Sequence, residues 1–239
     1  MRAVAPCWWP CSPHPRPERG PVSRIINGMP ALAVSLLLLL AAYLLGSLSG
    51  SLLLGKLRDV DIRTQGSGNA GGTNALRTQG WKFALGVVLI DVGKGALAAW
   101  LGLRLGPAEG PLPAAVLGYV SAFVATLGHV WPLWHGFRGR KGVGTLLGGL
   151  LLLWPLAVPW VLAAWLLVLV TSGYVGLASV VAVACLLPLA WLTDTDSACR
   201  VFACMAALLV LFTHRGNLQR LRAGSESRFE RARLLRRRA

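Results

Sequence analysis

The sequence GSGNAGGTNALR, residues 66–77, is polar and rich in glycine, yet it lies between two apolar runs, residues 30–54 and 82–103. Each run is long enough to cross a membrane as a helix, which takes about 20 residues. Glycines allow tight turns and let backbone N–H groups approach a ligand, and successive N–H groups in such a turn bind anions. The stretch therefore predicts a phosphate-binding loop, with a flexible connection as the alternative. It matches neither the P-loop pattern nor the dinucleotide-binding pattern, so no nucleotide is predicted.

The composition indicates an integral membrane protein. Of the 239 residues, 55% are apolar and only 14% are charged, while the formal net charge is +15. Because the cations lie in loops and in the C-terminal tail, we expect anionic membrane lipid and a phosphorylated substrate as partners, and no nucleic acid. The five cysteines show no disulfide framework and no metal-binding spacing, so neither a metal nor a cofactor is predicted.

Three segments are expected. Residues 1–28 are rich in Pro and Arg without periodicity, and they are expected to be disordered or untranslated, because Met29 stands just before the first apolar run. Residues 29–228 form the predicted membrane domain. Residues 229–239 are an Arg-rich tail, expected to anchor the chain to anionic lipid.

The apolar runs predict an all-α integral membrane protein, a bundle of seven transmembrane helices. The predicted spans are residues 30–54 as one unbroken helix, 82–103, 113–127, 143–170 as two short spans that turn near Pro155, 174–192 and 198–213. Two short spans within 143–170 place the glycine loop, the RGRKG run and the C-terminus on one side, as the positive-inside rule requires. We therefore expect the N-terminus outside and the C-terminus in the cytoplasm.

Several charged residues lie within or beside the spans. Asp91 and Lys94 have i,i+3 spacing near the middle of the second span, and a structural ion pair is favoured over catalysis. His129 and His135 lie among tryptophans and are expected at the membrane interface rather than as ligands. The RGRKG run, residues 138–142, precedes a predicted helix and indicates a second anion site, with ordinary positive-inside anchoring as the alternative.

A fourth polar cluster follows the last span. His214 and Asn217 share a face if the helix continues, and Arg220 and Glu226 follow. The predicted topology brings all these clusters to the cytoplasmic face, with many cations, hydroxyls and amides and few carboxylates. Such a site suits phosphate binding and the stabilisation of developing negative charge. The alternative is a transporter or channel for phosphate or a phosphorylated lipid precursor, but the chain has no internal repeat and its polarity gathers at one face.

Four stretches in this order resemble the motifs of the bacterial acyl-phosphate:glycerol-3-phosphate acyltransferases (PlsY type). They are GSGNAGGTNALR, GHVWPLWHGFRGRKGVGT (128–145), YVGLASV (174–180) and HRGNLQRLRAGSE (214–226), and the resemblance covers about residues 30–228. It implies a multi-pass protein of the bacterial inner membrane that transfers a fatty acyl group from acyl phosphate to the 1-hydroxyl of glycerol 3-phosphate. The products would be lysophosphatidate and phosphate, in the first acylation of phospholipid biosynthesis. An enzyme that produces acyl phosphate would be a partner.

The resemblance also implies site residues. The candidate catalytic residues are Lys141, Ser179, His214 and Asn217. The candidate substrate-binding residues are Ser67, Asn69, Thr73, Asn74, Arg77, Arg138 and Glu226. Arg77, Lys141 and Ser67 would hold glycerol 3-phosphate, and the glycine loop would cradle the acyl phosphate. Either the donor phosphate or His214 would take the hydroxyl proton.

The chain departs from the family pattern at a few positions. Gly72 stands where the family usually has Ala, and the RGRKG run replaces Lys-Gly-Gly-Lys-Gly. Gly176 replaces a serine, which puts the role of that hydroxyl in doubt. The early Gly-Ser-Ile-Pro is Gly46–Ser49 here, without the helix-bending proline.

Overall fold

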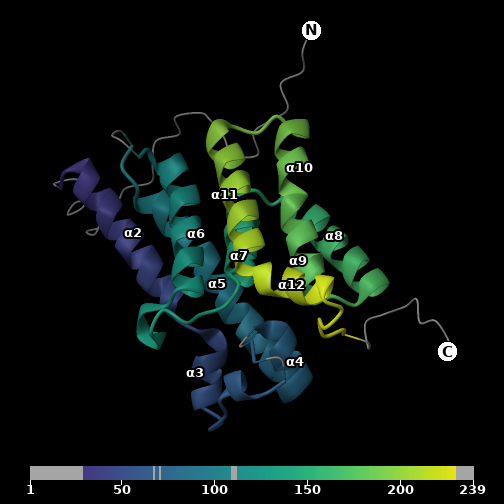
Figure 1. Cartoon of the computed structure of the whole chain (residues 1–239). Helices are drawn as coiled ribbons and strands as arrows, with labels where there is room; N and C mark the ends of the chain where they lie inside the picture. Colours follow the sequence, from purple (N-terminus) through teal and green to yellow (C-terminus); the bar gives the residue numbers. More distant parts are fainter. Residues whose placement is uncertain (1–28, 67, 70, 109–111, 230–239) are drawn as a thin grey trace.

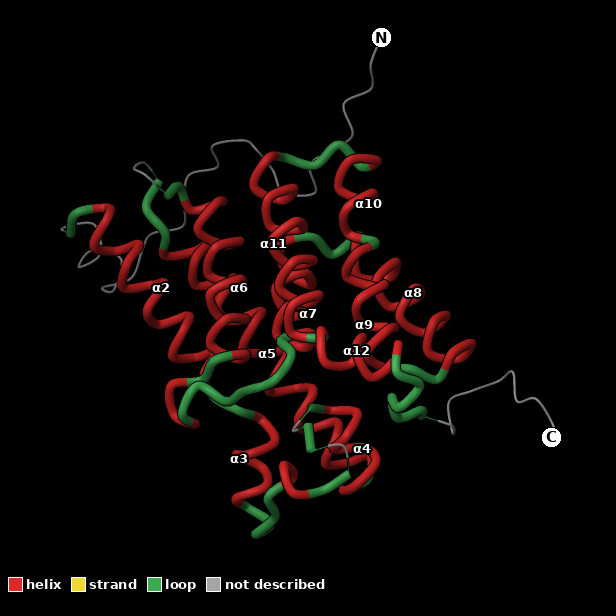
Figure 2. Tube along the Cα trace, viewed as in Figure 1, coloured by secondary structure: helices red, strands yellow, loops and turns green. Residues whose placement is uncertain are grey.

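The apolar runs form helices in a computed structural model that describes residues 29–66, 68–69, 71–108 and 112–229 (Figure 1). The helical elements are α2 (Ala31–Ser47), α3 (Gly50–Lys56), η1 (Ile62–Thr64), α4 (Gly72–Gln79), α5 (Trp81–Leu105), α6 (Ala114–Val130), η2 (Leu133–His135), α7 (Val143–Leu153), α8 (Ala157–Ser172), α9 (Val175–Ala184), α10 (Leu186–Leu192), α11 (Ser197–Thr213) and α12 (Arg215–Arg222). Within those ranges the chain forms no β-strand, as the all-α prediction requires (Figure 2). The predictions for residues 1–28, for Ser67 and for nearly all of the tail fall outside the described residues.

The prediction of an unbroken first helix is wrong. The chain bends by 50° between α2 and α3, although no proline stands at this point. Two side chains satisfy the backbone there: the Ser49 hydroxyl accepts a hydrogen bond from Leu52 N at 3.3 Å, and Lys94 Nζ donates to the carbonyls of Gly46, at 2.7 Å, and Leu48. A helix end needs such partners for its unpaired backbone groups, and here the side chains replace the proline in supporting the bend.

Helix α5 lies at the centre of the bundle, against α2, α3, α4, α6 and α7. Small residues make these contacts close. A Cβ atom on Gly95 would overlap the Thr145 backbone of α7, and one on Gly148 would overlap the Val92 backbone of α5. Interfaces of this kind are typical of membrane helices, which associate through close backbone packing rather than through a hydrophobic driving force.

The break predicted near Pro155 is confirmed, because α7 ends at Leu153 and α8 begins at Ala157. Three helical stretches are long and apolar enough to cross a membrane: Trp81–Leu105, Ala114–His135 and Val175–Leu192. The number rises to five if each of two bent pairs, α2 with α3 and α11 with α12, counts as one span. Helices α7 and α8 are apolar but shorter, so the count of seven spans and the sides of the termini stay predictions.

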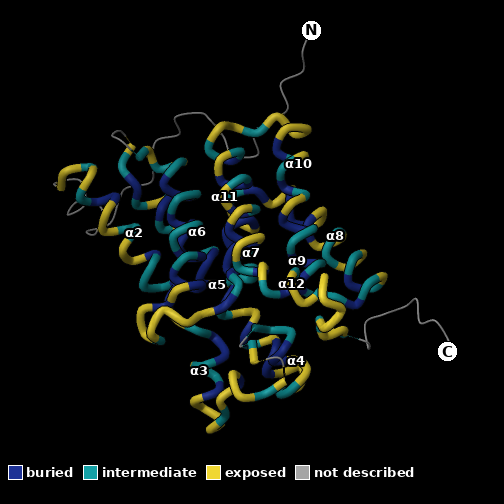
Figure 3. The backbone as a smooth tube through the Cα atoms, viewed as in Figure 1, coloured by how far each residue is buried: buried dark blue, intermediate teal, exposed yellow. Residues whose placement is uncertain are grey.

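Buried and exposed apolar residues divide between the inside and the outside of the bundle. The largest core cluster joins α6, α7, α8, α9 and α11, while leucines such as Leu36, Leu89 and Leu167 are more than half exposed on outer faces (Figure 3). Exposed leucines in this number suit a surface that faces lipid. At one end of the bundle α3, η1 and α4 project outward, and α12 lies across the same end (Figure 1). The polar loops meet at this end.

Candidate functional site

A cavity of about 1040 Å³ opens where the glycine loop, the RGRKG run, α9 and α12 meet, and we call it the main cavity. It brings together all but two of the residues that the sequence put forward as catalytic or substrate-binding. Those that line it are Asn69, Thr73, Asn74, Arg77, Lys141, Ser179, His214, Asn217 and Glu226. Arg138 lines a different cavity, and Ser67 lies outside the described residues.

The glycine loop is shorter than predicted. Gly66 and Gly68 have positive φ angles of 58° and 70°, which few other residues adopt, so the loop needs glycine there. The second half of the stretch is not a loop, because α4 begins at Gly72 and carries Thr73, Asn74 and Arg77. The residue before it, Gly71, has no side chain to cap the first turn. The N–H groups of that turn therefore give the rim of the main cavity a positive potential.

Asn74 shapes this loop. Its side chain is almost fully buried, and Nδ2 donates to the carbonyl oxygens of Gln65 at 2.9 Å and Ile62 at 3.4 Å. These bonds tie the start of α4 to the segment before the glycines. Asn74 lines the main cavity as predicted, but its amide N–H groups are used to position the loop.

His214 lies in a break between two helices, so the helix does not continue through this residue. α11 ends at Thr213, and α12 follows at a bend of 54°. His214 Nδ1 lies 2.8 Å from the Val210 carbonyl oxygen, and because a carbonyl only accepts, this nitrogen carries the proton and Nε2 is left as the acceptor. Burial and, next, the charge of Lys141 lower the pKa of His214 to about 4. The imidazole is therefore neutral at neutral pH.

A carboxylate fixes the residues on α12. Glu226 accepts a hydrogen bond from Asn217 Nδ2 at 2.6 Å and forms an ion pair with Arg220 Nε at 2.7 Å. Glu226 was predicted to bind substrate, but both of its carboxylate oxygens are bonded to neighbouring side chains, Asn217 and Arg220, and orient them. Gly176 packs against Asn217, and a Cβ atom at this position would lie 2.8 Å from the Asn217 Cβ. The glycine that replaces the family's serine therefore leaves the space that Asn217 fills.

The hydroxyl of Ser179 is held on α9 beside this cluster. It donates to the Val175 carbonyl at 2.9 Å and accepts from Trp165 Nε1 at 3.3 Å, and the residue is buried. A serine whose hydroxyl is oriented by two protein partners suits a positioning role better than that of a free nucleophile.

Lys141 brings a cation into the cavity beside His214. Thr213 Oγ1 donates to the Lys141 backbone carbonyl at 3.2 Å, which joins the RGRKG run to the end of α11. Burial lowers the pKa of the Lys141 ammonium from its ordinary value. Arg77 also lines the cavity and is exposed, with its guanidinium 5.7 Å from the Phe229 ring centre. The carboxylates that line the cavity, Asp91 and Glu226, are both ion-paired, so the cavity attracts anions.

Arg140 has a different role from the one its motif suggested. Its guanidinium is buried, with Nη1 2.7 Å from Asp91 Oδ2 and Nη2 bonded to the hydroxyls of Ser49 and, at 2.7 Å, Ser51. The predicted pair of Asp91 with Lys94 is confirmed at 3.5 Å. Arg140 thus acts as the structural link between the α2–α3 bend, α5 and the RGRKG run. Spacing alone gave no sign of which cation in the run would be buried.

His129 is buried among protein side chains, and its predicted place at the membrane interface stays a prediction. It is buried in α6, and its Nδ1 lies 3.7 Å from Asp91 Oδ1 without a hydrogen bond to any described residue. His135, by contrast, is only partly buried, in η2.

The main cavity continues into an apolar arm between α7, α8 and α9. The side chains of this arm come from Leu146, Leu147, Leu150, Val161, Leu162, Trp165, Ala182 and Val183. Sequence reasoning did not single these residues out, because an apolar residue in a membrane span carries no sign of whether it meets lipid, protein or ligand. One cavity therefore has a cationic polar end and an apolar end.

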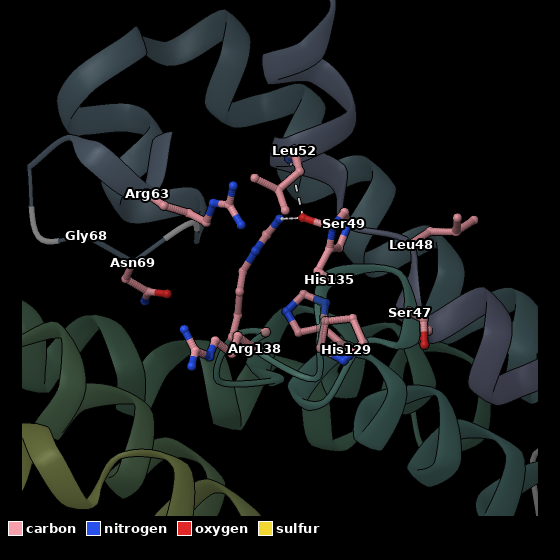
Figure 4. Close-up of a pocket in the computed structure, with 14 residues that line it drawn as sticks. Ser47, Leu48, Ser49, Leu52, Arg63, Gly68, Asn69, His129, His135 and Arg138 are labelled. Carbon is pink, nitrogen blue, oxygen red and sulfur yellow. Dashed lines mark hydrogen bonds between the residues drawn. The ribbon is translucent and has the colours of Figure 1, made fainter. Parts of the chain in front are cut away.

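A second cavity of about 200 Å³ lies beside the first, between the α2–α3 bend, η1 and η2, and we call it the arginine cavity (Figure 4). Arg63, Arg138 and Arg140 line it, so Arg138 faces this space and not the main cavity.

Comparisons with known proteins agree with one another. The family model described as "Glycerol-3-phosphate acyltransferase" matches residues 36–224. A protein of that name from Symbiobacterium thermophilum is 43% identical over 187 residues, which cover 78% of this chain and 90% of the relative. Another from Clostridioides difficile is 38% identical over 192 residues, 80% of this chain and 93% of the relative.

Solved structures give the same result. A crystal structure of PlsY, an integral membrane glycerol 3-phosphate acyltransferase, in its glycerol 3-phosphate form has a TM-score of 0.74 and 31% identity, covering 82% of this chain and 95% of that one. The lysophosphatidic acid form has a TM-score of 0.73 and 30% identity, covering 81% and 94%.

Proposed function

Since the chain belongs to the glycerol-3-phosphate acyltransferase family, we propose that it transfers a fatty acyl group from acyl phosphate to the 1-hydroxyl of glycerol 3-phosphate in the main cavity. The observation that carries this proposal is the union, in one cavity, of a cationic polar end and an apolar arm. Both substrates are phosphates and one bears a hydrocarbon chain, so the reaction needs both ends.

Glycerol 3-phosphate binds at the polar end. Lys141 and Arg77 supply the cations, and the hydrogen bond to Glu226 fixes the orientation of the Asn217 amide. Charge-assisted hydrogen bonds to a phosphate are the strongest kind available here, at about 1.5–3 kcal/mol each. Ser67, which the sequence motif adds to this set, belongs to the same proposal.

The acyl phosphate lies with its chain in the apolar arm and its phosphate toward the first turn of α4. Burying hydrocarbon there contributes about 0.8 kcal/mol per methylene. Thr73 and Asn69 lie at this rim, and the N–H groups of a helix start favour an anion. The acyl carbon then comes to the boundary between the apolar arm and the cations, near Ser179 and His214.

In the reaction the 1-hydroxyl oxygen bonds to the acyl carbon and the bond from this carbon to the phosphate oxygen breaks. Inorganic phosphate leaves, and the cations stabilise the negative charge that develops. The donor brings phosphoryl oxygens that can accept the hydroxyl proton, and burial keeps the His214 imidazole neutral. In this proposal the donor phosphate takes the proton, and neutral His214, through Nε2, orients the reacting groups.

The same proposal covers the setting of the enzyme. The chain is a multi-pass membrane protein by its apolar helices and its relatives. We place it in the bacterial inner membrane with seven spans, the N-terminus outside and the C-terminus in the cytoplasm, next to anionic lipid and to the enzyme that produces acyl phosphate. The cationic loops then face the compartment that holds glycerol 3-phosphate.

The test is an assay of purified protein in nanodiscs with acyl phosphate and glycerol 3-phosphate, following lysophosphatidate by mass spectrometry. The proposal predicts lysophosphatidate and phosphate in equal amounts, and much less product when acyl-CoA replaces acyl phosphate. Product from acyl-CoA at an equal rate would contradict the assignment of the donor.

A further inference from the structure

The arginine cavity has the chemistry of an anion site. The described residues that line it include three arginines, two histidines, two serines and one asparagine, and no carboxylate. Its volume of about 200 Å³ is several times the roughly 30 Å³ that one water molecule occupies in the liquid, so it has room for a phosphate-sized ion. Figure 4 shows Arg63 and Arg138 at the upper and lower sides of this space, with Asn69 to the left between them.

The arginines differ in how far other groups satisfy them. Arg140 is buried, and its guanidinium is ion-paired with Asp91. Arg63 donates hydrogen bonds to the Asp61 carboxylate through Nε and Nη2. These side-chain hydrogen bonds are the main reason why the pKa of Asp61 is lowered to about 2. Nη1 of Arg63 takes no part in the pair. Arg138 is exposed, and its guanidinium makes no hydrogen bond or ion pair to any residue in the described ranges.

Two histidines line the space. Burial, followed by the charges of Arg63 and Arg140, lowers the pKa of His135, so this side chain experiences a positive potential. His129 lies at the wall that both cavities share, and its Nδ1 is buried 3.7 Å from Asp91 Oδ1.

We propose that the arginine cavity binds inorganic phosphate, held chiefly by Arg138 and the free edge of Arg63. The two cavities share Gly68, Asn69, His129, Gly139 and Arg140, so they adjoin. The source of the ion rests on the proposed function, because phosphate is the group that leaves the acyl donor in the main cavity. A neighbouring site that takes up the released ion frees the main cavity for the next acyl phosphate.

The proposal is tested by equilibrium dialysis of the purified protein, in nanodiscs of phosphatidylcholine, against radiolabelled inorganic phosphate. Wild type is expected to bind phosphate at two sites. Arg138→Gln should weaken one of them at least tenfold, and Lys141→Met should weaken the other. Arg58→Gln is the matched control, because Arg58 is an exposed cation outside both cavities, over the Phe83 ring. Its isotherm should equal that of wild type.

Binding in Arg138→Gln that equals binding in Arg58→Gln would overturn the proposal, as would a single phosphate site in wild type that only Lys141→Met weakens. Repeating the titration with phosphatidylglycerol in the nanodiscs separates the free ion from a lipid headgroup. Loss of the Arg138-dependent site under those conditions would overturn its assignment to inorganic phosphate. Phosphate binding is measured without turnover, so it can be tested even if the protein fails to transfer acyl groups.

Discussion

Removing the guanidinium of Arg140 should destabilise the protein far more than removing that of Arg138, two residues away. In Arg140→Gln the carboxylate of Asp91 loses its 2.7 Å partner and keeps the more distant Lys94, at 3.5 Å, and the Gly50 N–H, at 3.3 Å. Ser49 and Ser51 lose the donor that now bonds to both hydroxyls. Breaking a buried ion pair by removing one partner costs about 3–5 kcal/mol, because the other charge stays buried.

The cost of the matched variant Arg138→Gln follows from its exposure. Surface substitutions away from such networks change stability by less than about 0.5 kcal/mol. For a chain of this size 1 kcal/mol corresponds to about 2–4 °C in Tm. Arg140→Gln should therefore lower Tm by about 6–20 °C and Arg138→Gln by no more than about 2 °C.

Tryptophan fluorescence during a thermal ramp in detergent measures both variants, since the chain has ten tryptophans. Equal Tm values for Arg140→Gln and Arg138→Gln would refute the assignment of Arg140 as the buried link.

Three further variants test the main cavity. Burial and Lys141 lower the pKa of His214 to about 4, so the imidazole is neutral above that pH and gains a proton only below it. The pH profile of kcat/KM for wild type, measured from about pH 5.5 to 8.5, should therefore show no inflection near pH 6.5 that is lost in His214→Gln. Such an inflection would make His214 the titrating base. In Gly176→Ala the new Cβ would lie 2.8 Å from the Asn217 Cβ, at an overpacking cost of about 1–3 kcal/mol. This variant should lower kcat/KM about fivefold to a hundredfold. A kcat/KM equal to that of wild type would show that Asn217 moves freely. Val161→Trp fills part of the apolar arm and should slow transfer from a long-chain acyl phosphate more than from a short one; an unchanged ratio of the two rates would place the chain elsewhere.

The sequence predicted the large elements because their signals are strong and local. Apolar runs of span length, the Trp154–Pro155 interruption and the order of the polar clusters required no knowledge of the packing. The bend between α2 and α3 escaped prediction for a physical reason. It depends on Lys94, more than 40 residues away, whose ammonium satisfies the carbonyls at the end of α2.

The candidate site was predicted in the same uneven way. The family resemblance led to Lys141, Ser179, His214 and Asn217, which do share one cavity. It could not tell which cations of the RGRKG run are buried, because burial depends on which residues of α3 and α5 lie opposite. In the structure Arg138 faces the smaller cavity and Arg140 is buried against Asp91. The apolar arm had no signal at all, since its side chains are of the same kind as those that meet lipid.

The central claim is that the main cavity binds the phosphates of both substrates through its cations. The most direct measurement is kcat/KM for lysophosphatidate formation by Lys141→Met, with Lys82→Met, an exposed lysine on α5 outside both cavities, as its matched control. Losing one charge-assisted contact worth about 1.5–3 kcal/mol should lower the value for Lys141→Met by about tenfold to more than a hundredfold and leave Lys82→Met near wild type. Equal activity of the two variants would contradict the account.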